Sequence, residues 1–368
     1  MPRNICRWGF LSTAAIGRKN WKAVRLSGNA TVTAVASRTT LAAQQFIQEC
    51  MDEVPMSPER PVAVEGYEAL LQRDDVDAVY IPLPTAMRAR WVRQAAASGK
   101  HVLCEKPVAI DHAQALDMVQ ACREHGVQFM DGVMLNHSRR LEAMKADLTG
   151  AGGIGSLRRA YAAFTFNGGD DFNRSNIRTD SRLEPHGCLG DLGWYSIRIL
   201  LWAFGYQLPV AVTARSLRGL QGEHSPAPVP GEFSAELFFP GGATAALYNS
   251  FVTENQQIAI FSGDRGYVQL DDFVLPFYSP ERSWTCNQNV LEVDNCRWNM
   301  RQHANRKAIN EYPSGEANAQ EVNMIRTFSQ LVNEQCLDDF WPEITLKTQR
   351  VLDACYASAQ QAGKQIAL

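Results

Sequence analysis

Apolar and polar positions in the first third of the chain follow the alternation of a βα fold. Residues 5–12 form a short apolar run, and apolar residues then recur at helical spacing over 16–26. The same order repeats through an apolar strand that ends at Ser37 and further pairs up to a helix over 111–125. Continuous apolar strands are typical of a parallel sheet covered on both faces, so we predict an α/β Rossmann domain over residues 1–130.

After about Met130 the pattern changes to long β-like runs. Two runs contain Gly-centred turns, at Pro240–Gly242 and Gly263–Gly266, which are typical of hairpins. Pro and Gly content predicts a loop over 221–231. Helical periodicity returns in three segments, 191–204, 319–333 and 344–361. Residues 131–368 are therefore predicted to form an α+β domain for substrate binding and oligomerisation, with a largely antiparallel open sheet. Packing of the C-terminal helix back on the first domain is left open.

Composition narrows the class of partner. The net charge of −3, with Lys and Arg dispersed, gives no electrostatic footprint for nucleic acid or an acidic membrane surface. No apolar run approaches the roughly 20 residues that span a bilayer, and the start, MPRNICRWGF, lacks the apolar region of a signal peptide. Nine widely spaced cysteines without a CxxC pair indicate reduced thiols in a cytoplasmic protein. Seven histidines without an HxH or HExxH pattern predict no metal site.

The turn after the first strand is a candidate phosphate-binding loop. The sequence STAAIG at Ser12–Gly17 stands where a GxGxxG fingerprint belongs, with small residues in place of the first two glycines. Small residues let the backbone approach a pyrophosphate, and the following helix N-terminus presents N–H groups to the anion. Ser12, Thr13, Ala14 and Ile16 are therefore candidate cofactor-binding residues. A tight turn that uses small residues for packing is the alternative interpretation.

The end of the second strand predicts which dinucleotide binds. Ribose selectivity is decided at this point in a Rossmann domain, about twenty residues after the phosphate loop. Ser37 and Arg38 stand there, with no acidic side chain to accept the 2′-hydroxyl of NAD. The Arg38 guanidinium can pair with a 2′-phosphate and stack on adenine, so we predict NADP over NAD. In the alternative interpretation Arg38 is a solvated surface charge.

Two separate segments supply candidate catalytic residues. Glu105 and Lys106 follow a strand and precede Pro107, which excludes a helical conformation for Lys106. In the second half, GDLGWY leads into a predicted helix that places Asp191 and Tyr195 four residues apart on one face. Each residue also has an ordinary structural interpretation: a solvated Lys, a helix-capping Asp and a core Tyr.

Together these residues suit proton transfer at an alcohol carbon. A phenol with an ordinary pKa near 10 is a poor base at neutral pH. A neighbouring ammonium group favours the phenolate, so Lys106 with Tyr195 would form a general base, or a general acid in the reducing direction. Asp191 would orient substrate hydroxyls or balance the charge of Lys106.

Six motifs resemble, in order and spacing, the Gfo/Idh/MocA oxidoreductase superfamily over nearly the whole chain. They are YIPLPTAMR, VLCEKPVAI, FMDGVML, LGDLGWYSIR, NMIRTF and VLDACYASAQQAGK. The closest branch uses tyrosine as the acid/base and contains dihydrodiol dehydrogenases and aldose-oxidising enzymes. The resemblance implies NADP-linked alcohol or sugar redox chemistry, with Pro82, Leu83, Glu105 and Lys106 at the cofactor.

The chain departs from this family at positions expected near the nicotinamide and the substrate. Thr85 and Arg88 stand where the family commonly has Asn and His, and Asn136 precedes His137 where an Arg is common. Asn136 is a candidate substrate residue. The other candidates precede the Asp191 motif, and loop capping or surface charge is their alternative interpretation; they are Asn176, Arg178 and His186.

Three functions remain open at this point. The leading one is an NAD(P)-dependent dehydrogenase or reductase acting on a sugar, polyol or cyclic alcohol. The second is a cofactor-binding regulator or scaffold, which would not need both Lys106 and Tyr195. The third is a glycosidase or lyase that oxidises and re-reduces its substrate without net redox. We also expect the open face of the antiparallel sheet to form a homodimer or higher homo-oligomer.

Overall fold

The computed structural model describes residues 5–57, 59–150 and 152–368. Its contacts divide the chain into two compact units. The first unit consists of the residues up to His137 together with Ser314–Gln349. The second consists of Ser138–Pro313 and Arg350–Leu368. The last helix, α11 (Phe340–Gln360), therefore contributes residues to both units. The sequence-based domains, 1–130 and 131–368, stay a prediction.

The first unit contains a six-stranded parallel sheet, which confirms the predicted Rossmann architecture. Its order is β3-β2-β1-β4-β5-β6. Strands β2 and β3 are thus added on one side of β1 and strands β4 to β6 on the other, so the strand order reverses between β1 and β4. Open α/β sheets bind ligands at the carboxyl ends of their strands beside such a reversal. The strands are β1 (Cys6–Leu11), β2 (Ala30–Ser37), β3 (Val62–Glu65), β4 (Ala78–Ile81), β5 (His101–Cys104) and β6 (Phe129–Asp131).

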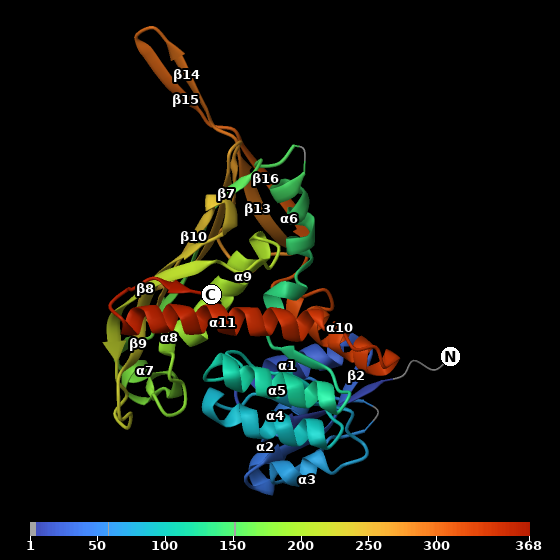
Figure 1. Cartoon of the computed structure of the whole chain (residues 1–368). Coiled ribbons are helices and arrows are strands. Elements are labelled where there is room, and N and C mark those ends of the chain that lie inside the picture. The colour runs from blue at the N-terminus through green and yellow to red at the C-terminus, as the bar shows by residue number, and fades with distance from the viewer. Residues whose placement is uncertain (1–4, 58, 151) are drawn as a thin grey trace. The chain divides into compact units, whose positions relative to one another are not determined.

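Helices surround this sheet in Figure 1. The apolar strands need cover on both faces, and part of that cover comes from the far end of the chain. The Trp8 ring of β1 lies 5.1 Å from the Phe328 ring of α10, and its indole N–H donates to the Ser329 hydroxyl at 3.1 Å. The helices are α1 (Ile16–Ser27), α2 (Thr40–Glu53), α3 (Tyr67–Leu71), α4 (Thr85–Ala97), α5 (His112–Glu124), η1 (Met134–His137) and α10 (Gln320–Glu334).

The second unit contains a nine-stranded, mostly antiparallel sheet, with the order β16-β13-β12-β11-β7-β10-β9-β8-β17. This confirms the predicted sheet type, although β7 and β10 pair in parallel. The predicted turns at Pro240–Gly242 and Gly263–Gly266 join antiparallel pairs as expected. The strands are β7 (Leu157–Asn167), β8 (Ala211–Leu220), β9 (Val229–Phe238), β10 (Thr244–Ser250), β11 (Val252–Gly263), β12 (Tyr267–Leu270), β13 (Glu281–Asn287), β16 (Ala304–Asn310) and β17 (Ile366–Ala367).

Two local predictions for this unit are wrong. The loop predicted over 221–231 ends early, because β9 begins at Val229 and pairs with the end of β8 despite its Pro and Gly content. The helix predicted from Asp191 is interrupted, because Asp191 ends α8 (Gly187–Asp191) and α9 (Gly193–Ala203) starts anew. At Gly193 an added Cβ would lie 3.0 Å from a methyl of Leu189, so glycine allows close packing where the helix breaks.

The helices of this unit lie mainly around one face of the sheet. Every residue from Gly193 to Trp202 of α9 is buried, and apart from Ser196 and Arg198 their side chains are apolar or aromatic. Its contacts are with β7 and β10 in the middle of the sheet. The remaining helices are α6 (Arg139–Thr149), α7 (Gly169–Ser175), η2 (Ile177–Thr179) and η3 (Pro240–Gly242).

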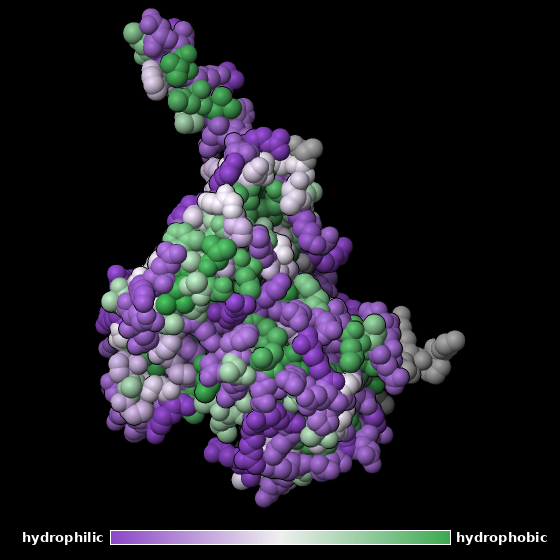
Figure 2. Space-filling model, in the orientation of Figure 1, coloured by the Kyte–Doolittle hydropathy of each residue, from purple (hydrophilic) through white to green (hydrophobic). Residues whose placement is uncertain are grey.

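A two-stranded arm extends from the ends of β13 and β16 (Figure 1). It consists of β14 (Val290–Asp294) and β15 (Arg297–Arg301), which the sequence analysis did not predict. Strand alternation and register place apolar side chains on one face of the arm, and these are between 50 and 69% exposed: Leu291, Val293, Trp298 and Met300. Figure 2 shows this hydrophobic surface among polar residues.

The described residues also bear on three expectations from composition, which concern membrane-spanning helices, disulfides and groups of metal ligands. Among their helices none combines the length and the apolar character that crossing a bilayer requires. All nine cysteines are free thiols. Over the same described ranges, no three His, Cys, Asp or Glu side chains are grouped as metal ligands.

Candidate functional site

The predicted cofactor residues gather at the carboxyl edge of the six-stranded sheet. Ser12 follows β1, Ser37 ends β2, Pro82 follows β4 and Glu105 follows β5. Neighbouring parallel strands end at the same edge, so the fold brings together segments that lie up to 93 positions apart in sequence, from Ser12 to Glu105. Thr13 and Ala14 are half-buried and Ile16 is exposed, whereas Leu83 is buried.

The turn at Ser12 has the backbone geometry of a glycine loop. Ser12 has φ of +133°, a conformation that residues with a side chain rarely adopt. Its hydroxyl accepts a hydrogen bond from the Ala14 N–H at 3.1 Å, which stabilises the turn. Gly17 stands at the third glycine of the GxGxxG fingerprint, where the helix must pack closely. A Cβ there would lie 3.1 Å from the Phe46 ring. This close packing holds α1 against α2 and aims the α1 N-terminus at the sheet edge.

Arg38 lies directly after the end of β2. Its side chain is exposed, and its charge acts on the Tyr67 phenol nearby. Burial raises the pKa of Tyr67, and Arg38 partly offsets this. Thr39 caps α2 through a hydrogen bond from the Ala42 N–H at 3.3 Å.

Glu105 turns inward and fixes the segment that carries Lys106. Its carboxylate accepts a hydrogen bond from the Tyr80 hydroxyl at 2.7 Å and another from the Lys106 N–H at 3.2 Å. Burial, followed by the charge of Glu105, raises the pKa of Tyr80 well above its usual value, so Tyr80 remains a donor at neutral pH. Lys106 itself is half-buried. Burial also raises the pKa of the preceding Cys104 thiol to about 12, which excludes it as a thiolate nucleophile near pH 7.

Thr85 and Arg88, the departures from the family pattern, form hydrogen bonds that hold the loop containing Lys106 and Pro107. Arg88 is 5% exposed and donates from Nε to the Leu83 carbonyl at 2.7 Å. Its Nη1 donates to the Pro107 carbonyl and to the Thr85 hydroxyl, the latter at 3.2 Å. The guanidinium thus connects the loop after β4 with the loop after β5. Sequence reasoning noticed Arg88 only as a departure and missed this role.

In the second unit, Arg178 links the predicted residues around Tyr195. Arg178 Nε lies 2.8 Å from Asp191 Oδ2, and the Asp191 side chain is only 12% exposed. The nearby charge of Asp191 is the largest cause that raises the pKa of Arg178, and Glu184 and Tyr195 contribute in the same direction. Asn176 holds Arg178 by accepting its backbone N–H at 3.0 Å and its Nη1 at 3.4 Å. Asn176 therefore does cap a turn, and in doing so it fixes a residue beside Asp191.

Tyr195 itself is buried in the first turn of α9, with 7% of its surface exposed. The Phe164 ring of β7 packs edge-on against its ring at a centroid distance of 5.9 Å. The next residue, Ser196, accepts a hydrogen bond from the Asn249 side chain of β10 at 2.9 Å. The phenol is thereby held by packing on the sheet rather than by a mobile loop, which suits a group that must present one atom to a substrate.

The two remaining predicted substrate residues lie in different units. His186 is buried before α8, and its ring lies edge-on to the Tyr356 ring at 4.8 Å. Asn136 is half-buried in η1, after β6. His186 belongs to the same unit as Asp191, whereas Asn136 belongs to the unit that carries Lys106.

A cavity of about 300 Å³ lies elsewhere in the second unit, between α6 and strands β13 and β16. Asp147 forms an ion pair with Lys307 in its wall and accepts a hydrogen bond from the Trp284 indole at 2.8 Å. The predicted site residues do not line this cavity. Its charged groups satisfy one another, so we look for functional residues at the sheet edge of the first unit and, separately, around Tyr195 in the second.

Comparison with known families agrees with this arrangement. A family model for the oxidoreductase family with an NAD-binding Rossmann fold, GFO/IDH/MocA, matches residues 6–133, and the model of the GFO/IDH/MocA C-terminal domain matches residues 145–269. The chain belongs to the GFO/IDH/MocA family. The resemblance drawn from the EKP and GDLGWY segments is therefore confirmed.

Two relatives of this GFO/IDH/MocA member are named for reactions on sugars. The chain is 32% identical over 253 residues to D-xylose 1-dehydrogenase (NADP(+)) 2 from Haloferax volcanii, covering 68% of this chain and 71% of that one. It is 37% identical over 196 residues to dTDP-3,4-didehydro-2,6-dideoxy-alpha-D-glucose 3-reductase from Actinomadura kijaniata, covering 53% and 55%. The chain matches between 42 and 60% of the length of the first three curated relatives, which are all such reductases.

Solved structures of GFO/IDH/MocA enzymes share the whole architecture. A 3-ketoreductase from Actinomadura kijaniata in complex with NADP superimposes with a TM-score of 0.75 at 26% identity, covering 96% of this chain and 98% of that one. Structures of the same reductase exist for a tyrosine-to-phenylalanine variant and for lysine variants, in complex with NADP and TDP-benzene.

The residues at the sheet edge of this GFO/IDH/MocA member fit a dinucleotide. Ser12 has a glycine-like φ, Gly17 packs directly on Phe46, and the N-terminus of α1 at Ala15 has no side-chain cap to compete with an anion. These are the features that a pyrophosphate requires of a Rossmann turn.

Proposed function

We propose that this protein is an NADP(H)-dependent oxidoreductase that transfers hydride between the nicotinamide and a sugar, polyol or related cyclic alcohol, or the corresponding carbonyl compound. The observation that carries the proposal is the environment of Tyr195, a buried phenol held rigidly beside the Arg178–Asp191 ion pair. Oxidising an alcohol requires a group that removes the hydroxyl proton, and a positioned tyrosine can do so when cations favour its ionised form.

Each residue has a distinct role in this proposal. Bound NADP would supply the acceptor or donor of the hydride. Tyr195 takes the hydroxyl proton during oxidation and returns a proton to the carbonyl oxygen during reduction. Lys106 stabilises negative charge on the reacting oxygens, and Asp191 orients the substrate hydroxyls. Arg178 holds Asp191 in place.

The remaining candidates are assigned by their surroundings. Asn176 acts as a positioning residue, because its amide oxygen is already used to hold Arg178. His186 and Asn136 are proposed to contact the substrate. The cofactor residues are those predicted at the edge of the parallel sheet. They are Ser12, Thr13, Ala14, Ile16, Ser37, Arg38, Pro82, Leu83, Glu105 and Lys106.

Relatives support both the reaction and the cofactor. The dehydrogenase from Haloferax volcanii is named for D-xylose and NADP, and the ketoreductase from Actinomadura kijaniata was crystallised with NADP. The lysine and tyrosine substitutions made in that reductase involve the same residue types as Lys106 and Tyr195.

Selection of NADP is tested by titrating the protein with NADPH and with NADH while following nicotinamide fluorescence. Arg38→Ala is expected to raise the Kd for NADPH by roughly 10- to 100-fold, since a charge-assisted contact to phosphate is lost, and to change the Kd for NADH by less than about twofold. Arg93→Ala is the matched control, because Arg93 is also exposed in this unit and pairs with Asp117. Equal effects of the two substitutions on NADPH would refute the role of Arg38.

The reaction is tested with a panel of aldoses, polyols and dihydrodiols, monitored at the nicotinamide absorbance band. Tyr195→Phe is expected to lower kcat at least a hundredfold and to leave the Kd for NADPH unchanged, because only proton transfer is removed. A double-mutant cycle with Lys106→Met shows whether the two residues act together. Retention of wild-type kcat by Tyr195→Phe would refute the proposal.

Two outcomes of this panel would favour the other functions. Consumption of a substrate without any change in nicotinamide absorbance would indicate a glycosidase or lyase with no net redox. Tight NADPH binding without turnover of any substrate would indicate a regulator or scaffold.

We also propose a homodimer formed through the open face of the nine-stranded sheet. Half-buried apolar residues sit together on this face, on adjacent strands that the helices do not cover: Tyr161, Tyr248, Ile258 and Ile260. Ile260→Asp is expected to convert the dimer to a monomer, because a charge there would be buried without a partner. Light scattering at micromolar concentration tests this, and a monomeric wild-type protein would contradict it.

A cytoplasmic location is the last part of the proposal. All nine cysteines are free, as expected for a compartment that keeps thiols reduced. Fractionation of the source cells, with detection of the protein, tests the assignment.

A further inference from the structure

The segment from Asp271 to Pro280, here called the aromatic loop, exposes large apolar side chains on a fixed backbone. It connects β12 with β13. Leu275 is 51% exposed, Phe277 61% and Tyr278 93%. Apolar groups clustered on a surface in this way commonly mark a binding site.

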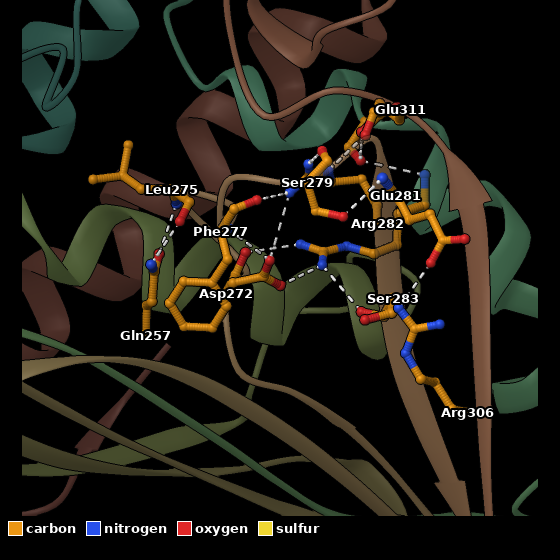
Figure 3. A network of polar contacts seen from close by, with 12 residues as sticks. Gln257, Asp272, Leu275, Phe277, Ser279, Glu281, Arg282, Ser283, Arg306 and Glu311 are labelled. Atoms are coloured by element: carbon orange, nitrogen blue, oxygen red, sulfur yellow. Dashed lines mark hydrogen bonds and ion pairs between the residues drawn. The ribbon is translucent and has the colours of Figure 1, made fainter.

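Polar contacts to its backbone hold the aromatic loop in one conformation (Figure 3). Gln257 of β11 donates to the Leu275 carbonyl at 2.6 Å and accepts from the Leu275 N–H at 2.7 Å. Arg282, whose side chain is fully buried, donates to the carbonyls of Phe277, at 2.7 Å, and Ser279. Asp272 accepts from the Phe277 N–H at 3.0 Å. A loop held at both ends and in its middle loses little entropy when it binds a ligand.

Four charged side chains in or next to the aromatic loop are buried and are here called the polar layer: Arg140, Asp272, Arg282 and Glu311. Charge balance explains how they can be buried. Asp272 forms an ion pair with Arg140 and lies 3.7 Å from Arg282, so one carboxylate serves two guanidinium groups. Glu311 adds a second carboxylate and accepts hydrogen bonds from the Ser138 hydroxyl and the Arg139 N–H, at 2.5 and 2.7 Å. With two cations and two anions in the layer, the charges compensate and the structure of the loop is strongly determined.

The aromatic loop lies on the same face of the sheet as Tyr195. Gln257 is the cross-strand partner of Phe164, so both side chains project from one face. Phe164 packs against Tyr195 at 5.9 Å and against Phe273, at the start of the loop, at 6.2 Å. A continuous row of rings therefore joins the proposed proton-transfer residue to the base of the loop.

We propose that the aromatic loop forms one wall of the substrate site in this unit, with Phe277 and Tyr278 packing against the apolar face of a cyclic substrate. This inference rests on the proposed function and specifies its substrate class. A pyranose or carbocycle presents a flat face of C–H groups to an aromatic ring, whereas an extended acyclic polyol does not, so the loop favours cyclic substrates.

The test compares Phe277→Ala and Tyr278→Ala with the wild-type enzyme, using pyranoses and acyclic polyols of equal carbon number. Each substitution is expected to lower kcat/KM for the cyclic substrates by roughly five- to twentyfold, mainly through KM, as for loss of an aromatic contact. The values for acyclic substrates and the Kd for NADPH are expected to change less than about twofold. Phe277→Tyr, which keeps the ring, is expected to retain most of the wild-type kcat/KM.

The control is Trp298→Ala, which removes an aromatic side chain that is 69% exposed on the arm. The inference is overturned if the loop variants match the wild type on cyclic substrates, or if they act no differently from Trp298→Ala. It is also overturned if light scattering shows that they change only the association state. Absence of turnover by the wild-type enzyme would instead refute the proposed function, and the inference with it.

Discussion

Replacing Arg282 with methionine is expected to destabilise the second unit by about 3–5 kcal/mol. Arg282 is fully buried, and its three nitrogens donate to the carbonyls of Phe277, Ser279 and Glu311. Methionine fills much of the same volume but provides no donor. The substitution therefore removes the donor from all three carbonyls, of which the Glu311 carbonyl accepts a buried hydrogen bond, and removes one cation from the layer that contains Asp272.

The magnitude follows from these contacts. A buried acceptor deprived of its donor costs about 1–3 kcal/mol, and removing one member of a buried charge network costs about 3–5 kcal/mol in total. Arg306→Met provides the comparison on the neighbouring strand. Arg306 pairs with Glu281 at 2.9 Å, but both side chains are about half exposed, so its loss is expected to cost less than about 1 kcal/mol.

Hydrogen exchange measured by mass spectrometry on the native protein locates the effect. Peptides from residues 271–310 are expected to exchange about a hundred- to several-thousandfold faster in Arg282→Met, and at a nearly unchanged rate in Arg306→Met. Peptides from the six-stranded sheet act as an internal reference in both variants. Equal exchange in the two variants would show that the buried network does not hold this region, and would remove the argument that the aromatic loop is rigid.

Three further predictions concern single residues. Ser12→Gly is expected to be more stable to heat than Ser12→Ala by about 1 kcal/mol, since only glycine relieves the positive φ, and the reverse order would show that the turn is unstrained. Burial alone would raise the pKa of Asp147, but hydrogen bonds led by Lys307 lower it below 3.8, so the stability it contributes is present above that value and lost as pH falls through the folded pKa. Urea titrations should therefore show a gap between wild type and Asp147→Asn that narrows on acidification below about pH 4, and a constant gap would contradict this. Arg178→Met is expected to lower kcat about tenfold or more without changing the Kd for NADPH, whereas a change in NADPH binding alone would assign Arg178 to the cofactor.

The fold of the first unit could be predicted because its signals are local. Apolar strands such as AVYI at Ala78–Ile81 are buried throughout, and each is followed by a helical pattern, so composition and order suffice. The turn at Ser12 was also visible, because its position after the first strand matters more than the identity of its residues. The positive φ of Ser12 could not be predicted, since residues other than glycine rarely adopt it.

The second unit shows where such reasoning stops. The parallel pairing of β7 with β10 and the ion pair between Arg178 and Asp191 depend on contacts between distant segments, which periodicity does not contain. The break before Gly193 stands beside a close contact with Leu189, which the sequence pattern does not reveal. The aromatic loop was missed for a similar reason, because Arg140, which pairs with Asp272 at its start, comes from a distant part of the sequence.

The return of the chain to the first unit has a consequence for its synthesis. Trp8, near the start, is covered by Phe328 and Ser329, which a ribosome adds only after all of the second unit up to Pro313. Domains usually fold in the order in which they emerge. Here the cover of Trp8 in β1 is missing until residues 328 and 329 have been added, so a premature stop after residue 313 would leave part of the six-stranded sheet uncovered.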